Sequence, residues 1–204
     1  MTSENRILEG TMELFKRYGI KAVTMDDIAK HLGISKKTIY QFYSDKDAMV
    51  NALIEIELNS HMKSFDKIEA ASKNAVDEII SMMKYMGSEF SGVNPNMFYD
   101  MQKYHPAAWI KFKEFKESYI YKCVIKNLEA GKEQGYYRVG LNQKIIAKMR
   151  LEHVEMTFNP TIFPPDKFNL SQVQIELLDH FLHGICTIKG HKLINKYKQI
   201  SEDE

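Results

Sequence analysis

Two short helical patterns joined by a tight turn at residues 24–43 limit the fold of this chain more than any other feature. Thr24 and Asp27 have the spacing of a capping box, in which each side chain satisfies a free backbone N–H at the start of a helix. Gly33 permits a sharp turn because glycine adopts positive φ without steric cost, and Ser35 can cap a second helix. Two helices joined in this way form a helix-turn-helix, whose second helix enters a DNA major groove.

The second helix of this motif carries polar side chains suited to DNA. Lysine can reach guanine acceptors or phosphates, glutamine can pair with adenine, and threonine and tyrosine can donate to phosphates. Four lysines between residues 30 and 46 stand against one aspartate, a local net charge of +3 in a chain whose total is only +1. This local charge sets the field at a phosphate backbone. The candidate DNA-binding residues are Thr24, Ser35, Lys36, Lys37, Thr38, Tyr40, Gln41, Tyr43 and Lys46.

Helical periodicity continues along the rest of the sequence. Prolines number 5 and glycines 10, and no segment alternates with period two for long enough to form a strand. The pattern therefore predicts an all-α fold, with the caps of the sixth and ninth helices at Asn94–Pro95 and Ser171–Gln174. The expected helices span residues 7–18, 25–32, 36–43, 45–68, 75–91, 95–104, 106–134, 143–158 and 171–197.

The predicted division is a three-helix DNA-binding domain over residues 1–48 and a helical ligand-binding and dimerisation domain over residues 49–204. The helix at 45–68 would link the two as a rigid lever. The small polar stretch 69–74 is a candidate boundary after it.

Aromatic and methionine side chains are concentrated between residues 90 and 121. Flexible methionine beside tyrosine suits an adaptable apolar pocket with a few polar anchors. The same residues could instead only pack helices together. The candidate ligand-pocket residues are Phe90, Met97, Phe98, Met101, Tyr104, Trp109, Phe112, Phe115 and Tyr119.

Residues 7–50 resemble the amino-terminal domain of the TetR family of regulators. The matching residues are Ile7, Leu14, Phe15, Gly19, Thr24, Ile28, Ala29, Gly33, Ser35, Lys36, Ile39, Tyr40, Tyr43, Lys46 and Met49. The resemblance implies a homodimeric repressor that binds a palindromic DNA operator and responds to a small-molecule effector. It also implies that a ligand pocket forms between helices and that the last two long helices make a four-helix dimer interface.

The resemblance further divides the DNA contacts into two groups. It implies backbone contacts at Thr24, Lys36, Tyr40, Tyr43 and Lys46, and base contacts at Lys37, Thr38 and Gln41. One departure stands out, because many members have histidine and then phenylalanine where this chain has Phe42 and Tyr43. Phenylalanine cannot donate to a phosphate, so we do not expect Phe42 to make the contact that histidine often makes.

An apolar stripe near the C-terminus follows helical spacing and is suited to a dimer interface, which two palindromic half-sites require. The candidate interface residues are Met149, Met156, Leu178, Phe181, Leu182, Ile185 and Ile188.

The sequence contains none of the usual catalytic or metal-binding patterns. Glu176 and His180 share a helix face, but Glu-x-x-His spacing on two helices is lacking, and no nucleophile elbow or phosphate-binding loop is present. We therefore expect no catalytic site, metal site or cofactor. The two cysteines, Cys123 and Cys186, are expected to be buried thiols of a cytoplasmic protein without a membrane partner. The alternatives are a regulator without a ligand, gated by a protein partner or constitutive, and a helical metal protein or enzyme with an appended DNA-binding domain.

Overall fold

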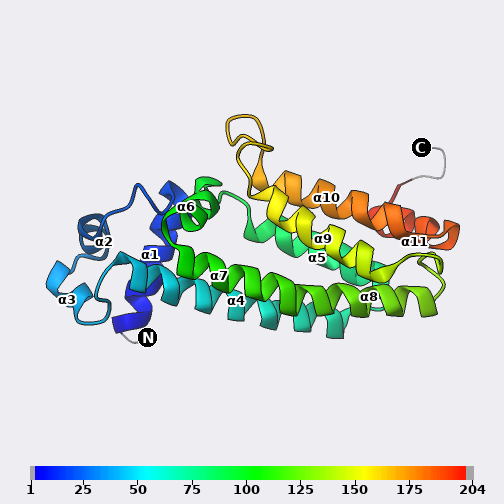
Figure 1. Cartoon of the computed structure of the whole chain (residues 1–204), viewed down its shortest axis with the longest axis horizontal. Helices are drawn as coiled ribbons and strands as arrows, with labels where there is room; N and C mark the ends of the chain where they lie inside the picture. Colours follow the sequence, from blue (N-terminus) through cyan, green and yellow to red (C-terminus); the bar gives the residue numbers. More distant parts are fainter. Residues whose placement is uncertain (1–2, 201–204) are drawn as a thin grey trace.

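The computed structural model describes residues 3–200 as an elongated, helical molecule (Figure 1). The short helices of the amino-terminal region lie at one end of its long axis, and the last helix lies at the other. The helices are α1 (Ser3–Tyr18), α2 (Met25–Leu32), α3 (Lys36–Tyr40), α4 (Lys46–Ala71), α5 (Ala75–Glu89), α6 (Asn96–Tyr104), α7 (Pro106–Phe115), η1 (Lys116–Ile120), α8 (Tyr121–Glu133), α9 (Gln143–Thr157), α10 (Leu170–Ile185) and α11 (Ile188–Lys198). Residues 3–200 contain no β-strand, so the predicted all-α fold is confirmed.

The first three helices form the predicted helix-turn-helix domain. Thr24 and Asp27 make both halves of the capping box at the start of α2. Gly33 ends α2 with a φ of 65°, a left-handed conformation that favours glycine. Ile28 and Ile39 are fully buried, so one face each of α2 and α3 is fixed against the core while the other stays outside.

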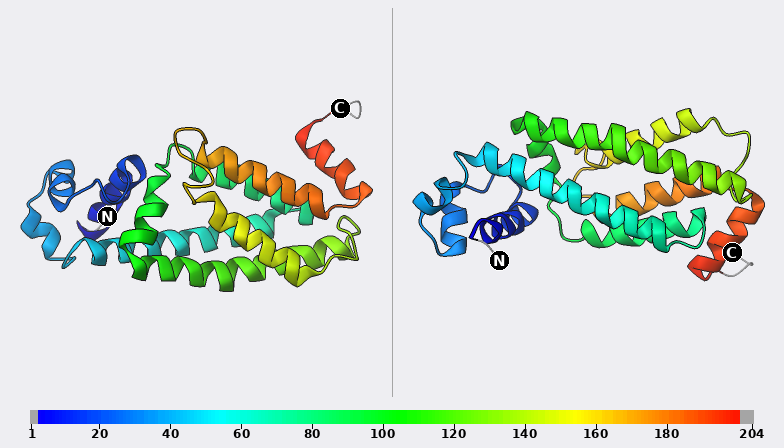
Figure 2. Two further views of the ribbon diagram at one scale, coloured as in Figure 1. Left: turned by 45° about the horizontal axis from the view of Figure 1, so that its top comes forward. Right: turned by 90° about the horizontal axis from the view of Figure 1, so that it is seen from below.

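The long helices run side by side along the molecule. α4 packs along α7, and α10 packs against α5 (Figure 2). α4 begins at the helix-turn-helix end of the molecule and is 26 residues long, ending at Ala71, three residues beyond the predicted end. Of the polar stretch 69–74, residues 72–74 form the turn from α4 into α5, where Asn74 caps α5 by accepting from the N–H groups of Val76 and Asp77.

The helix predicted over residues 106–134 is one continuous rod with a π-helical turn in its middle. The segment η1 joins α7 to α8 without a break in the chain direction. A π-turn holds an additional residue in the helix and changes the faces that its two halves present. Phe115, which precedes this turn, and Tyr119 within it have rings that stack at 5.5 Å between centroids.

The helix predicted over residues 171–197 is wrong, because the chain breaks after Ile185 into α10 and α11. Cys186 forms an isolated antiparallel bridge with Tyr137, which takes it out of the helix. Thr187 then caps α11 by accepting from the N–H of Gly190. A contact distant in sequence therefore overrides a continuous helical pattern.

Two predicted caps and one helix end also differ. α10 is capped by Asn169 rather than by Ser171, whose hydroxyl donates to the carbonyl of Gly87. Pro95 is the N-cap residue of α6 and not its first residue. α3 ends at Tyr40, and residues 41–42 form a turn instead of continuing the helix to residue 43. No helix within residues 3–200 is long and apolar enough to cross a membrane.

Candidate DNA interface and ligand cavity

The recognition helix α3 is held in place from its buried side and its N-terminus. Ile39 is fully buried beneath it. Ser35 accepts a hydrogen bond from the N–H of Thr38 at 3.1 Å, and its hydroxyl lies 2.9 Å from that of Thr38. The helix N-terminus therefore lies at the surface with its positive dipole end available to a phosphate.

Three predicted DNA-binding side chains are free at the surface of this end of the molecule. Lys37, Tyr40 and Gln41 are exposed and come from α3 or the residue that ends it. Phe42, at the position where the family often has histidine, is 41% exposed. An exposed phenylalanine can contact a sugar or a thymine methyl but cannot donate to a phosphate.

Two of the predicted backbone-contacting residues, Lys36 and Lys46, make hydrogen bonds within the protein. Lys36 Nζ donates to Asp26 Oδ2 at 2.9 Å, and this hydrogen bond raises the pKa of the lysine. Lys46 Nζ donates to the carbonyl of Val23 at 2.6 Å, and burial lowers the pKa of its ammonium group. Lys46 thus joins the loop before α2 to the start of α4.

Tyr43 is a buried residue, and only its hydroxyl approaches the surface. The hydroxyl donates to Glu4 Oε1 at 3.0 Å. Burial, together with the nearby Glu4, raises the pKa of Tyr43 to about 12. Because Lys36 and Lys46 already bond within the protein, less positive charge is available to DNA than the sequence predicts. Within α3, Lys37 is the exposed lysine that makes no such bond.

We expect Lys37→Ala to weaken binding to the preferred DNA sequence by about 1–3 kcal/mol and to relax the base preference at one position. Lys36→Ala is expected to have a smaller effect, because Asp26 already neutralises that ammonium group. Competition binding with a set of single-base operator variants measures both. Lys73→Ala, an exposed lysine in the α4–α5 turn, is the control. An equal loss on every sequence for Lys37→Ala would contradict a role in reading bases.

A largely apolar cavity of about 170 Å³ lies inside the helical bundle. It is lined by side chains from α1, α4, α5, α6, α7, η1, α8, α9 and α10. Six of the nine predicted pocket residues line it: Phe90, Met97, Phe98, Met101, Phe112 and Phe115. The other three lie elsewhere. Tyr104 is exposed on α6, Trp109 packs on Phe112, and Tyr119 donates to the carbonyl of Met62.

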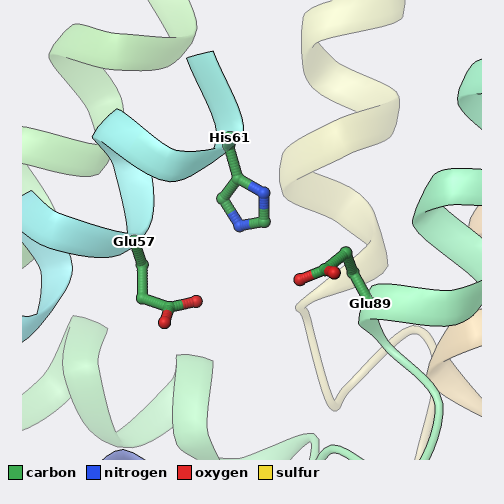
Figure 3. Close-up of side chains that lie close together, drawn as sticks. All are labelled: Glu57, His61 and Glu89. Atoms are coloured by element: carbon green, nitrogen blue, oxygen red, sulfur yellow. The ribbon is translucent and has the colours of Figure 1, made fainter. Parts of the chain in front are cut away.

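Polar side chains that sequence reasoning missed form one wall of this cavity. Glu57, His61 and Glu89 offer ligand-type atoms within 4.8 Å of one another (Figure 3). Glu57 and His61 are four residues apart on α4 and face Glu89 at the end of α5. The i, i+4 spacing of a glutamate and a histidine was the available signal. Lys16 Nζ lies 3.3 Å from Glu57 Oε2, so a protein cation already occupies part of this acidic wall.

Arg150, Asn127 and Gln174 are further polar residues of the cavity lining that the sequence analysis did not single out. All three are buried, with exposed fractions of 7%, 6% and 2%. Asn127 donates to the carbonyl of Ala75 at 3.0 Å. Nothing in the spacing of Arg150 or Gln174 marks either of them as buried, because both belong to amphipathic helices with several polar positions.

The cavity is in direct contact with the helices that hold the DNA-binding end. Met12 and Phe15 of α1 line it. Nearby, Asp100 of α6 accepts the backbone N–H of Lys21 at 2.7 Å, and the N–H of Asn94 donates to the carbonyl of Lys16 at 2.7 Å. A change in the shape of the cavity would therefore act on α1 and on the loop before α2, which are in contact with the helix-turn-helix.

The predicted interface stripe divides into buried and exposed residues. Leu178, Phe181, Leu182 and Ile185 are at most 4% exposed and belong to the hydrophobic core of the protomer itself. They are thus covered by the same chain. Met149 and Ile188 are exposed and Met156 is half-buried, so these remain available to a second copy.

Comparisons with known proteins agree with the motif and the architecture. Residues 7–53 match the family model described as bacterial regulatory proteins, tetR family. The chain is 28% identical over 185 residues to the HTH-type transcriptional regulator YvaF of Bacillus subtilis (strain 168), covering 89% of this chain and 95% of that protein.

Two solved structures share the fold. The transcriptional regulator FadR from Bacillus subtilis in complex with stearoyl-CoA superposes with a TM-score of 0.66 at 16% identity, covering 90% of this chain and 100% of that one. A transcriptional regulator from Saccharomonospora viridis in complex with choline gives a TM-score of 0.73 at 17% identity, covering 91% of this chain and 100% of that one. The sequence match at the helix-turn-helix, the similarity along most of the chain and the shared fold lead to one assignment. Residues 7–53 are thus a DNA-binding domain of the tetR type, and over most of its length the chain is similar to an HTH-type transcriptional regulator.

Proposed function

We propose that the protein is a cytoplasmic, homodimeric repressor that binds a palindromic operator and is released by a small molecule bound in the central cavity. The observation that carries this proposal is that α1, which packs against α2 of the helix-turn-helix, and α4, which follows α3 in the chain, also line the cavity. An effector that fits the cavity better in one arrangement of these helices than in the other would shift the population between them.

The cavity itself favours a ligand-gated regulator over one gated only by a protein partner. A fully packed sensing domain would have left no free volume, whereas this one encloses about 170 Å³ lined mainly by methionine, phenylalanine and aliphatic side chains. Two proteins of the same fold hold small molecules, stearoyl-CoA in one and choline in the other. We assign no enzymatic activity, since the relatives are named as regulators of transcription.

The second protomer would pack on the outer faces of α9 and α10. Ile145 and Met149 are 64% and 40% exposed on α9, one helical turn apart. Gly184 of α10 is exposed and has no neighbouring atom within 4 Å of an added Cβ, which allows a close approach of another helix. A two-fold axis through these helices would place one recognition helix at each half-site of a palindrome.

We expect Asp100→Ala to weaken the coupling between the cavity and the DNA-binding end. Its carboxylate is 6% exposed and holds the backbone N–H of Lys21, so its loss leaves a buried donor unpaired at a cost of about 1–3 kcal/mol. Amide hydrogen exchange should be faster at Lys21 in the variant. Asp100→Asn, which keeps an acceptor oxygen, is the control and should protect that amide better. Unchanged exchange at Lys21 in Asp100→Ala would show that this contact does not hold the loop.

Selection of binding sites from random duplex DNA tests the proposed function. We expect an inverted repeat, with half-site centres about one helical turn of DNA or a multiple of it apart, and two protomers per bound duplex by sedimentation. Footprinting of the selected site should show protection of both half-sites. Failure to enrich any repeat, or binding as a monomer, would contradict the proposal.

A further inference from the structure

Arg150 on α9 is a buried cation that pairs with no carboxylate among residues 3–200. It is 7% exposed and lines the central cavity. Its Nη1 atom is buried and has no hydrogen-bond partner within residues 3–200. Burial alone lowers the pKa of this guanidinium to about 10, because no nearby carboxylate offsets it. The charged group lies near the Phe181 ring, whose centroid is 6.0 Å from Cζ.

The second buried cation of the helical domain has the opposite environment. Lys116 is 1% exposed, but it pairs closely with Glu155 and lies 3.8 Å from a carboxylate oxygen of both Glu152 and Glu117. The fold therefore compensates one buried cation with three carboxylates and leaves the other with none. An unpaired buried charge costs several kcal/mol of folding free energy. Such a destabilising group is typical of a functional site, where a bound molecule supplies the opposite charge.

The surroundings of Arg150 match an anion attached to an apolar body. Gln174, 2% exposed on the facing α10, lines the same cavity and has an amide that can donate. Val154, Leu178 and Phe181 line the cavity beside it with apolar groups. Glu57 and Glu89 line the cavity as well and repel an anion. The charged group of a ligand is therefore directed to Arg150 and away from the acidic wall.

We propose that the effector is an amphipathic anion whose carboxylate or phosphate binds the guanidinium of Arg150 while its apolar part fills the methionine- and phenylalanine-lined cavity. This inference rests on the proposed role of the cavity as the effector site. A guanidinium fork and a carboxylate or phosphate form two parallel charge-assisted hydrogen bonds. In a buried, largely apolar site these bonds favour the anion over a neutral molecule of the same length.

Binding of matched ten-carbon probes to the purified full-length protein, measured by calorimetry and by the shift in melting temperature, tests the inference. Decanoate or decyl phosphate should bind about tenfold or more tightly than 1-decanol, since a hydrogen bond to a charged group contributes that much. The ratio between the two anions identifies the preferred headgroup. Arg150→Met should lose this preference while keeping its affinity for 1-decanol, and its ligand-free melting temperature should not fall. Lys122→Met, which removes an exposed lysine from α8, should behave as the wild type does.

Arg150→Lys keeps the positive charge but lacks the two parallel donors of the guanidinium group, so its preference for the anions over 1-decanol should be intermediate. This variant tests the inference even if Arg150→Met does not fold. The inference is overturned if neither anion binds, if the wild type binds 1-decanol as tightly, or if Arg150→Met keeps the preference. A separate measurement of operator affinity distinguishes the two proposals. If decanoate binds through Arg150 but leaves operator affinity unchanged, the anion site stands and the effector role fails. If a neutral molecule releases the operator, the effector role stands and the anion site fails.

Discussion

Replacing Gly131 by alanine is expected to destabilise the protein by about 3 kcal/mol or more and to lower its melting temperature by roughly 6–12 °C. A Cβ atom at Gly131 would lie 2.0 Å from Cδ2 of the Tyr137 ring. Tyr137 cannot move aside, because it is fully buried and its hydroxyl lies 2.9 Å from the carbonyl of Ala75 and 3.0 Å from Asn127 Oδ1. The clash would separate α8 from α5.

Helix propensity alone predicts that Gly131→Ala stabilises the protein, since alanine is favoured over glycine in a helix interior by about 1 kcal/mol. Urea unfolding followed by circular dichroism measures the change. Gly140→Ala is the control, because no atom lies within 4 Å of its added Cβ, and it should alter stability by less than about 0.5 kcal/mol. A Gly131→Ala protein as stable as the wild type would show that α8 and Tyr137 do not pack as described.

Glu155→Ala is expected to cost about 2–4 kcal/mol of folding free energy, because it leaves the buried Lys116 ammonium without its closest partner. Glu152 and Glu117, each 3.8 Å away, compensate only in part. Lys116→Met should cost less, since the carboxylates that it leaves behind reach solvent. The pair joins η1 to α9, so its loss should also loosen the wall of the cavity near Val154.

A double-mutant cycle in urea separates the pair from its surroundings. Lys116→Met combined with Glu155→Ala should be more stable than Glu155→Ala alone, because no buried charge then lacks a partner. Glu129→Ala, an exposed acid on α8, is the control and should change stability by less than about 0.5 kcal/mol. If Glu155→Ala lowers the free energy of unfolding no more than Glu129→Ala does, Lys116 does not depend on Glu155 for its charge compensation, which would contradict the prediction.

Local chemistry in the sequence was sufficient to predict the DNA-binding end. The capping box at Thr24, the glycine turn at Gly33 and the cap at Ser35 are all made by residues within a few positions of one another. Such contacts form wherever the helix forms. The apolar periodicity likewise predicted the existence and type of most later helices, and their ends were the least certain part.

Contacts between distant residues account for what the sequence did not predict. The break after Ile185 depends on Tyr137, which lies about fifty residues earlier. The resemblance placed Lys36 and Lys46 at DNA-backbone positions, but it did not indicate their hydrogen bonds to Asp26 and to the carbonyl of Val23, which form only in the folded chain. Periodicity also marked Leu178 and Leu182 as buried without indicating that the same chain covers them.

The cavity was predicted by its apolar composition but not by its polar groups. Phenylalanine and methionine in the middle segment pointed to six lining residues. Arg150 lies on a different helix, and its burial depends on how α9 rotates against α10. A charged residue in an amphipathic pattern is ordinarily expected at the surface, so sequence reasoning had no ground for placing it inside.

The claim that the cavity controls DNA binding is tested most directly by measuring how a bound compound and the operator change each other's affinity for the protein. A compound that raises the melting temperature of the protein should be titrated against the protein alone and against its complex with the selected operator. If the cavity controls DNA binding, the compound should weaken operator affinity by roughly 5–150-fold, and the operator should weaken the compound's affinity by the same factor. A compound that binds in the cavity while operator affinity stays unchanged would contradict the account.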